Sequence, residues 1–386
     1  HHYDFRDRRE QTVGPAAPYD FVVYDNLDRV VEQGLFSTVP TAINSPGRLS
    51  YSATEYSQRG LQYKTGVALD PASSTPIMLE SHTWYDEVGR AVAQQGPSGP
   101  KTKTTYDAFG RNAVFYVTDG KNDDAPGTAG SHADVYSNYA ADVSDDVVFA
   151  ETEYRYIDGT SLVDLVTMRE RTHDATDSDL GALASFTAGN AKKVITTYSG
   201  TYYDDANRVT HSVSYGTNHA SPPAYKYDGP VPTIDQASPP EFIVNDGAWY
   251  GAEGGMVQAT VYDERGMVEA VIDPNGRRTE SVYDSLGRTI LSIENADDAE
   301  LADPSWVDTD GGHWSVSNLF GGTGDDAERV TGFVYDLAGN LVKQTAYNKD
   351  LDASGATEYQ HTEYVYGVPD GAGTLDSDFT SNDVLH

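Results

Sequence analysis

Cysteine is absent from this 386-residue chain, and basic residues are few. Without cysteine the chain can form neither a disulfide bridge nor a cysteine-ligated zinc or iron–sulfur site. Only 26 Lys and Arg residues stand against 60 Asp and Glu residues, so the formal net charge is −34. Such a charge opposes binding to nucleic acid or to an anionic membrane through a basic face. We therefore expect no nucleic-acid partner, and expect solubility, cation binding or basic partners instead.

Long apolar runs are missing as well. No stretch approaches the roughly 18 apolar residues that a membrane helix needs, so we expect no membrane span. The chain also lacks an initiator Met and the charged and apolar regions of a signal peptide. We interpret residues 1–386 as one continuous region that belongs to a longer chain.

Tyrosine is abundant, with 27 residues against 11 Phe, and many tyrosines begin a recurring hexapeptide, Tyr-Asp-x-x-Gly-Arg with variations. Several neighbouring copies are 21 residues apart, as at Tyr85 and Tyr106. Regular internal repetition indicates a repeat architecture. Besides a degenerate copy at Tyr56, the copies begin at Tyr3, Tyr24, Tyr85, Tyr106, Tyr203, Tyr262, Tyr283 and Tyr335.

The hexapeptide has the residues of a tight turn. Asp is favoured at the first corner of a type I turn and Gly at the fourth, where a hairpin with a G1 bulge needs left-handed backbone. Where Gly is replaced, the substitutes are Asp7, Asp28 and Asn207, residue types that tolerate this backbone best. The structural turn residues that we predict are Tyr24, Asp25, Tyr85, Asp86, Gly89, Tyr106, Asp107, Gly110, Tyr262, Asp263, Gly266, Tyr283, Asp284, Gly287, Tyr335, Asp336 and Gly339.

Short alternating stretches separate these turns, and a second turn signal containing proline follows eleven residues after Tyr85 and after Tyr262. Runs of about five or six residues bounded by turn signals predict antiparallel strands. The fold class that we predict is all-β: antiparallel β-hairpin repeats that form one curved, spiralling sheet or shell, with loop insertions.

The repeated side chains have predicted roles. We expect each tyrosine to stack on its equivalent in the next hairpin, with its hydroxyl at a wet or hydrogen-bonded end. The Arg that ends the hexapeptide, as at Arg90, either bridges to an Asp of the same or a neighbouring turn or is a solvated charge of little energetic weight.

A longer period is also present, because Tyr85 and Tyr106 recur 177 positions later at Tyr262 and Tyr283. We therefore predict about two passes of a module of roughly 178 residues. Acidic insertions fall near residues 119–146 and 294–328, and the stacked units are expected to contact mainly their neighbours.

The segment Tyr262–Arg288, YDERGMVEAVIDPNGRRTESVYDSLGR, resembles the consensus unit of the RHS or YD-repeat family. The resemblance covers nearly the whole chain apart from the insertions. The family includes encapsulating subunits of bacterial insecticidal toxin complexes, polymorphic toxins, wall-associated proteins and teneurins. The resemblance implies a β-sheet ribbon that spirals into a hollow shell, which in the toxin members encloses a C-terminal effector. The family's self-cleaving core is not recognisable in this sequence.

From the repeats and the resemblance we expect a non-enzymatic shell or scaffold segment of a large secreted or surface-exposed bacterial protein, acidic and extracellular, that encapsulates a toxin cargo. Its partners would be the remainder of the same chain, neighbouring copies or an enclosed effector. The alternative is an extracellular adhesin or matrix protein that binds glycans or calcium through its insertions. We expect no enzyme, because the sequence has no HExxH or GxSxG motif and its adjacent acids have no partner base.

Residues 350–358 are the best candidate for a ligand site. Asp350, Asp352, Ser354 and Glu358 place oxygen atoms at alternating positions, as in a calcium loop, but His361 stands where such a loop has its bidentate Glu. The plain alternative is a polar insert. No cofactor is required, and calcium is the candidate ligand. For glycans, the aromatic residues of the second insertion form either a binding platform or that insertion's own small core.

Overall fold

The structure is a computed structural model, and it describes residues 1–120, 138–173, 175–176, 179–185, 193–217, 231–239, 242–245, 248–251, 255–295, 329–351, 357–364 and 366. The chain divides into two compact units. The first unit contains residues 1–198 and 217–222, and the second contains residues 199–216 and 223–386. Each unit is described below by itself.

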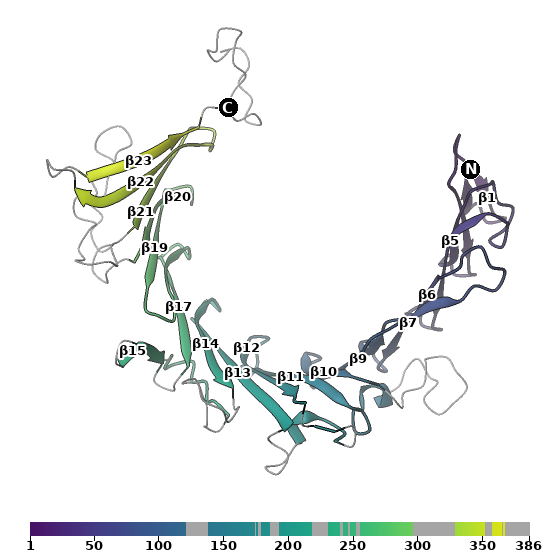
Figure 1. Ribbon diagram of the computed structural model, residues 1–386, viewed down its shortest axis with the longest axis horizontal. Coiled ribbons are helices and arrows are strands. Elements are labelled where there is room, and N and C mark those ends of the chain that lie inside the picture. Colours follow the sequence, from purple (N-terminus) through teal and green to yellow (C-terminus); the bar gives the residue numbers. More distant parts are fainter. Residues whose placement is uncertain are drawn as a thin grey trace, which may run out of the picture. The chain divides into compact units, whose positions relative to one another are not determined.

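The first unit consists of short strands that follow one another in chain order, with two single turns of 3₁₀ helix (Figure 1). Several of these strands, such as those at residues 19–24 and 112–118, are rich in the β-branched and aromatic residues that suit a pleated sheet. Its elements are β1 (His2–Tyr3), β2 (Arg9–Thr12), β3 (Tyr19–Tyr24), β4 (Val30–Phe36), β5 (Arg48–Tyr56), β6 (Gln62–Ala68), β7 (Met78–Tyr85), β8 (Ala91–Gln95), β9 (Lys101–Tyr106), β10 (Asn112–Thr118), η1 (Asn138–Ala141), β11 (Val148–Tyr156), β12 (Val163–Arg171) and η2 (Leu183–Ser185).

The second unit repeats this organisation. Strand β13 (Val194–Tyr203) precedes it and continues into it. The elements that follow are β14 (Val209–Thr217), β15 (Phe242–Asn245), β16 (Ala248–Gly251), β17 (Met256–Tyr262), β18 (Val268–Ile272), β19 (Arg278–Tyr283), β20 (Thr289–Glu294), β21 (Arg329–Tyr335), β22 (Leu341–Leu351) and β23 (Thr357–Glu363).

The all-β fold that we predicted from the turns is confirmed. The strands belong to one 21-stranded sheet, except for β15 and β16, which pair with each other. The strand pairs whose register is described are antiparallel, and consecutive strands pair with each other, as β7 does with β8 and β8 with β9. None of the described residues forms a helix long and apolar enough to cross a membrane.

One face of the sheet in the first unit is covered by the chain itself. We call it the covered face, and its central row runs across paired strands through Trp84, Ala93, Lys103, Tyr116, Glu151 and Arg169. Ala140 of η1 packs on Trp84, Val92 and Ala93. Further along, Val143 and Leu183 pack with Tyr116, Val148 and Val194. The loop segments near η1 and η2 thus give the sheet its hydrophobic core.

A buried ion pair fixes one of these covering segments. The Nζ atom of Lys103 lies 2.7 Å from Oδ2 of Asp146, and both side chains are fully buried. Lys103 also donates a hydrogen bond to the backbone carbonyl of Asp142. Lys101 is equally buried, and its Nζ lies 3.5 Å from the centroid of the Trp84 ring. Charges buried in this way need close partners, so the covering segment is bound in one position.

Candidate functional site

The hexapeptides form tight hairpin turns with a common geometry. In the turn at 106–111, the Gly110 amide donates to the Asp107 carbonyl at 3.0 Å, and the Asp107 amide donates to the Arg111 carbonyl at 2.9 Å. Gly110 has a φ of +82°, the left-handed backbone that a G1 bulge requires. Asp7, Asp28 and Asn207 occupy the same position with φ of 62–63°. Every predicted turn glycine has positive φ: Gly89, Gly110, Gly266, Gly287 and Gly339.

The Asp of each hexapeptide holds its own turn together. In the first hairpin, Oδ1 of Asp4 accepts the backbone amides of Arg6 at 2.8 Å and Arg8 at 3.0 Å. Its Oδ2 accepts the Nε of Arg8 at 2.6 Å. The same two-sided arrangement recurs at Asp25, Asp86, Asp107, Asp204 and Asp284, each paired with the Arg four residues later.

These hydrogen bonds lower the pKa of the turn carboxyls. In Asp204 and Asp284, the amide of the paired Arg is the main cause of the lowered pKa, and its guanidinium adds to it. In Asp25, Asp86 and Asp107, burial acts most strongly and in the opposite direction, but the hydrogen bonds from the paired Arg and its neighbours outweigh it and lower the pKa. The turn carboxylates are therefore held in the charged form.

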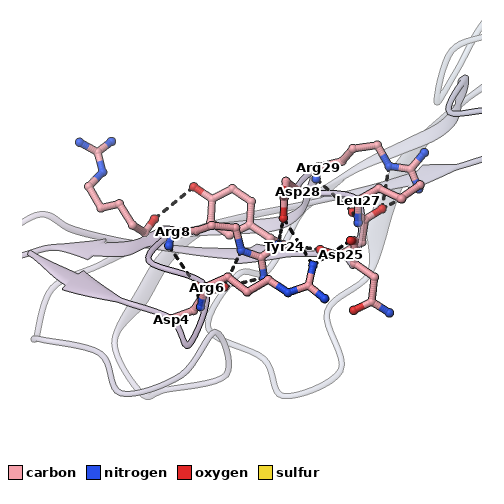
Figure 2. Close-up of polar contacts among 10 residues, drawn as sticks. Asp4, Arg6, Arg8, Tyr24, Asp25, Leu27, Asp28 and Arg29 are labelled. Atoms are coloured by element: carbon pink, nitrogen blue, oxygen red, sulfur yellow. Dashed lines mark hydrogen bonds and ion pairs between the residues drawn. The ribbon is translucent and has the colours of Figure 1, made fainter.

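The Arg also contacts the next hairpin. Figure 2 shows Arg8 between Asp4 of its own turn and the following hairpin, where its Nη1 donates to the Asp25 carbonyl at 2.7 Å. Its guanidinium carbon lies 4.9 Å from the centroid of the Tyr24 ring. Similar cation–π contacts, at 4.1–4.6 Å, join Arg29 to Tyr56, Arg90 to Tyr106, Arg111 to Tyr156, Arg208 to Tyr262 and Arg288 to Tyr335.

In eight hairpins the tyrosine hydroxyl completes the contact by donating a hydrogen bond to the backbone of the preceding hairpin. The acceptor is always the carbonyl of the residue just after that hairpin's hexapeptide, at 2.5–3.1 Å. We call this combination of paired Asp and Arg, tyrosine ring and tyrosine hydroxyl the inter-hairpin contact. The donors and acceptors are Tyr24 to Arg9, Tyr85 to Gln62, Tyr106 to Ala91, Tyr156 to Asn112, Tyr262 to Val209, Tyr283 to Val268, Tyr335 to Thr289 and Tyr366 to Leu341.

The partner of the tyrosine ring differs from our expectation. We expected tyrosines to stack on one another, but in six hairpins the ring lies against the guanidinium of the preceding turn. The reason is that the Asp holds the guanidinium in place beside the next hairpin, and a guanidinium over a ring gains a cation–π attraction. Of the two roles considered for the Arg, bridging to an Asp is the one observed: the Arg pairs with the Asp of its own turn, and Arg8 also pairs with Asp28 of the neighbouring turn at 2.7 Å.

Sequence reasoning missed two members of this series, Tyr156 and Tyr366. Neither begins a Tyr-Asp dipeptide, yet both donate the same hydrogen bond as the others. Tyr156 precedes a longer turn in which the Ile157 amide donates to the Leu162 carbonyl. The Asp158-Gly159 pair after Tyr156 is a turn signal that could have identified it.

The predicted ligand loop lies outside what the structure describes. Asp352 and Ser354 are outside the described residues, and so are the side chains of Asp350 and Glu358. Most of the two acidic insertions, with their aromatic residues, is outside them too. Within the described residues, no group of three or more His, Asp or Glu side chains is arranged to hold a metal ion.

No protein-family model matches the chain, and neither does any curated protein. Solved structures similar to it include a Tc holotoxin pore of Photorhabdus luminescens with a mutated TccC3, at 14% identity and a TM-score of 0.17 over 91% of this chain. Another is TcdB2-TccC3, at 11% identity and a TM-score of 0.18 over 95% of this chain. This chain spans 19% and 23% of the length of those two chains.

Proposed function

We propose that this chain is a wall segment of a large secreted bacterial protein of the RHS or YD-repeat type, and that the wall encloses a polypeptide cargo. The proposed role is structural and not catalytic. It combines the fold with the resemblance of Tyr262–Arg288 to the YD-repeat unit, and it goes beyond both.

The observation that carries the proposal is the inter-hairpin contact. The same Asp, Arg and Tyr side chains join one hairpin to the next in both units, as at Arg90 and Tyr106 and at Arg288 and Tyr335. A sheet assembled by such nearest-neighbour contacts can be lengthened one hairpin at a time. A continuous, extendable sheet of this kind suits a wall that separates two spaces.

Electron microscopy of the complete natural protein that contains residues 1–386 tests this proposal. We expect a closed cavity with polypeptide density inside it. An open ribbon or a filament with chain-to-chain contacts would overturn the proposal and favour the alternative role as a matrix protein.

Protease protection of the same protein gives an independent measurement. We expect the enclosed polypeptide to survive a protease that cuts a matched site placed in an exposed turn, for example beside Phe109, which is 78% exposed. Replacing tyrosines of the inter-hairpin contact with leucine should make the enclosed polypeptide cleavable. Equal cleavage of the inner and outer sites in the unaltered protein would contradict enclosure.

A further inference from the structure

The face of the sheet opposite the covered face has almost no charged side chains. Because paired residues of neighbouring strands point to the same face, the register defines it. In the first unit one row consists of Gln33, Ser52, Val67 and Leu79. The next row consists of Thr83, Gln94, Thr102, Val117, Ala150 and Glu170. We call this surface the neutral face.

Among the strands of the first unit whose register is described, charges enter the neutral face at its ends. From β3 to β12 its charged residues in register are Asp20 and Glu170. The covered face of the same strands differs sharply, because it carries Glu55, Lys64, Lys103, Glu151 and Arg169 among its paired residues. The difference between the two faces is therefore not a consequence of composition.

The second unit has the same chemistry on the corresponding face. A row runs through Ser281, Ser292, Thr331, Ala346 and Gln360. Beside it another row consists of Phe333, Gln344 and Thr362. The charged residues in register here are Glu294 and Arg329, and they form an ion pair with each other at 4.0 Å. Two units of one chain thus share this property.

Nothing in the described part of the chain buries the neutral face. Its residues named above are all half-buried or exposed, whereas the covered face holds buried residues such as Trp84 and Tyr116. A design rule for soluble proteins places charge on about 25–35% of the residues of an open surface. A broad uncharged surface on a chain with a net charge of −34 is therefore a surface kept for contact.

We propose that the neutral face is the surface that meets the enclosed polypeptide, and that it does so without selecting for the charge of that polypeptide. This inference rests on the proposed function. An uncharged wall neither repels nor traps acidic or basic segments, because it offers no fixed charge at short range. When the cargo approaches, the hydroxyls and amides of this face replace their hydrogen bonds to water by hydrogen bonds to the cargo. The net free energy gained by this replacement is small. The contact is consequently close but weak, so the cargo can leave.

Packing of two neutral faces against each other fits the residues less well. The inner faces of stacked sheets are apolar and interdigitated, whereas hydroxyl and amide groups such as those of Thr102, Gln94 and Ser292 would lose water without gaining partners. Apolar residues on this face, such as Val67 and Phe115, are interspersed with these polar groups. A polypeptide, which carries its own hydrogen-bonding groups, is the better match.

Photo-crosslinking in the complete natural protein tests the inference. The photoreactive residue p-benzoylphenylalanine replaces Phe115 or Phe333 on the neutral face, and Phe109 at an exposed turn is the matched control. After irradiation, mass spectrometry identifies the crosslinked peptides. We expect crosslinks to the enclosed polypeptide when the photoreactive residue is at position 115 or 333, and none when it is at position 109. The melting temperature of each variant shows whether it is folded.

The outcomes separate the two proposals. Crosslinks from the control position alone, in a protein whose cavity contains density, would overturn the role of the neutral face and leave the proposed function standing. Crosslinks between two neutral faces would overturn it in favour of association between copies. An open ribbon without an enclosed polypeptide would overturn the proposed function and this inference with it.

Discussion

The Asp of each hexapeptide connects local turn geometry to contacts between hairpins. One carboxylate oxygen of the Asp accepts hydrogen bonds from two backbone amides, and the other accepts a hydrogen bond from the Arg side chain, as in Asp107 and Arg111. The Arg, held flat in this way, presents its guanidinium to the Tyr156 ring at 4.1 Å. A lysine could not replace it, because a lysine ammonium lacks the planar, multiply bonding shape of a guanidinium.

The tyrosine hydroxyl is a separable part of this contact. Tyr106→Phe removes the 2.7 Å hydrogen bond to the Ala91 carbonyl but keeps the ring over Arg90. We expect the free energy of local opening at this hairpin to fall by about 0.5–1.5 kcal/mol, measured by hydrogen exchange of the Asp107 and Gly110 amides. Tyr106→Leu, which also removes the ring, should cost more. Equal effects of the two variants would show that the hydroxyl carries the whole contact.

The glycine at the fourth corner is needed for its backbone conformation. At Gly110, with a φ of +82°, a valine is strained, so Gly110→Val should destabilise the hairpin by about 1–3 kcal/mol. Gly110→Asn should cost clearly less, since Asn207 adopts the same conformation naturally. Thermal unfolding of the two variants measures the difference. Similar losses in both would mean that space near Arg90, and not φ, sets the cost.

At the scale of the element, the hairpins differ in how completely they form the contact. The hairpin at 56–61 has Ser57 and Leu61 in place of Asp and Arg, and the Ser57 Oγ accepts a hydrogen bond from the Leu61 amide. The hydroxyl of Tyr85 still donates to the Gln62 carbonyl. The hydrogen bond from tyrosine is therefore independent of the Asp and Arg pair.

Restoring the consensus residues at this hairpin should stabilise it. The double change Ser57→Asp with Leu61→Arg supplies the carboxylate and the guanidinium that the neighbouring hairpins have, and we expect a gain of about 0.5–2 kcal/mol in unfolding free energy. Chemical denaturation measures it. Ser57→Asp alone should not stabilise the chain, because it adds an uncompensated charge to an acidic protein. If Ser57→Asp alone raised the unfolding free energy, the stabilisation would come from the hydrogen bonds that the carboxylate accepts from backbone amides, and not from its pairing with the Arg.

The turns could be predicted from the sequence, whereas the contacts between hairpins could not. The conformation of residues such as Gly89 is a local property that Asp and Gly spacing specifies. The ring partner of Tyr106 depends on how two hairpins lie side by side, which no local pattern specifies. Tyr156 was missed because its turn lacks the hexapeptide, although its contact is preserved. The faces of the sheet become known only with the register.

At the scale of the whole molecule, the titrating groups predict a stability that falls in two steps with acid. Burial lowers the pKa of His211 below its ordinary 6.5. Burial also lowers the pKa of His82, because its effect there is larger than the opposite effect of the Glu80 carboxylate. The unfolded chain therefore takes up these protons first, and some stability is lost as the pH falls through about 6.5. The turn carboxyls have pKa values below 3.8, so their contribution is complete above about pH 5 and is lost progressively as the pH falls from there.

Denaturant midpoints recorded from neutral to acid pH measure the two steps. His211→Gln should reduce the first and leave the second, because the carboxyl groups are unchanged. The second step should be the steeper, since many hairpins such as those of Asp204 and Asp284 titrate together. A profile that is flat down to about pH 2 would show that the paired carboxyls contribute nothing to folding.

The inter-hairpin contact is indifferent to the distance along the chain that separates its partners. Tyr106 reaches an acceptor 15 residues earlier, Tyr156 one 44 residues earlier and Tyr262 one 53 residues earlier, with nearly the same oxygen-to-oxygen distance. Genetic additions between two hairpins can consequently vary in length and composition while the hairpins themselves keep their spacing. In such a protein, inserted loops can change during evolution without any change in the hairpins that they connect.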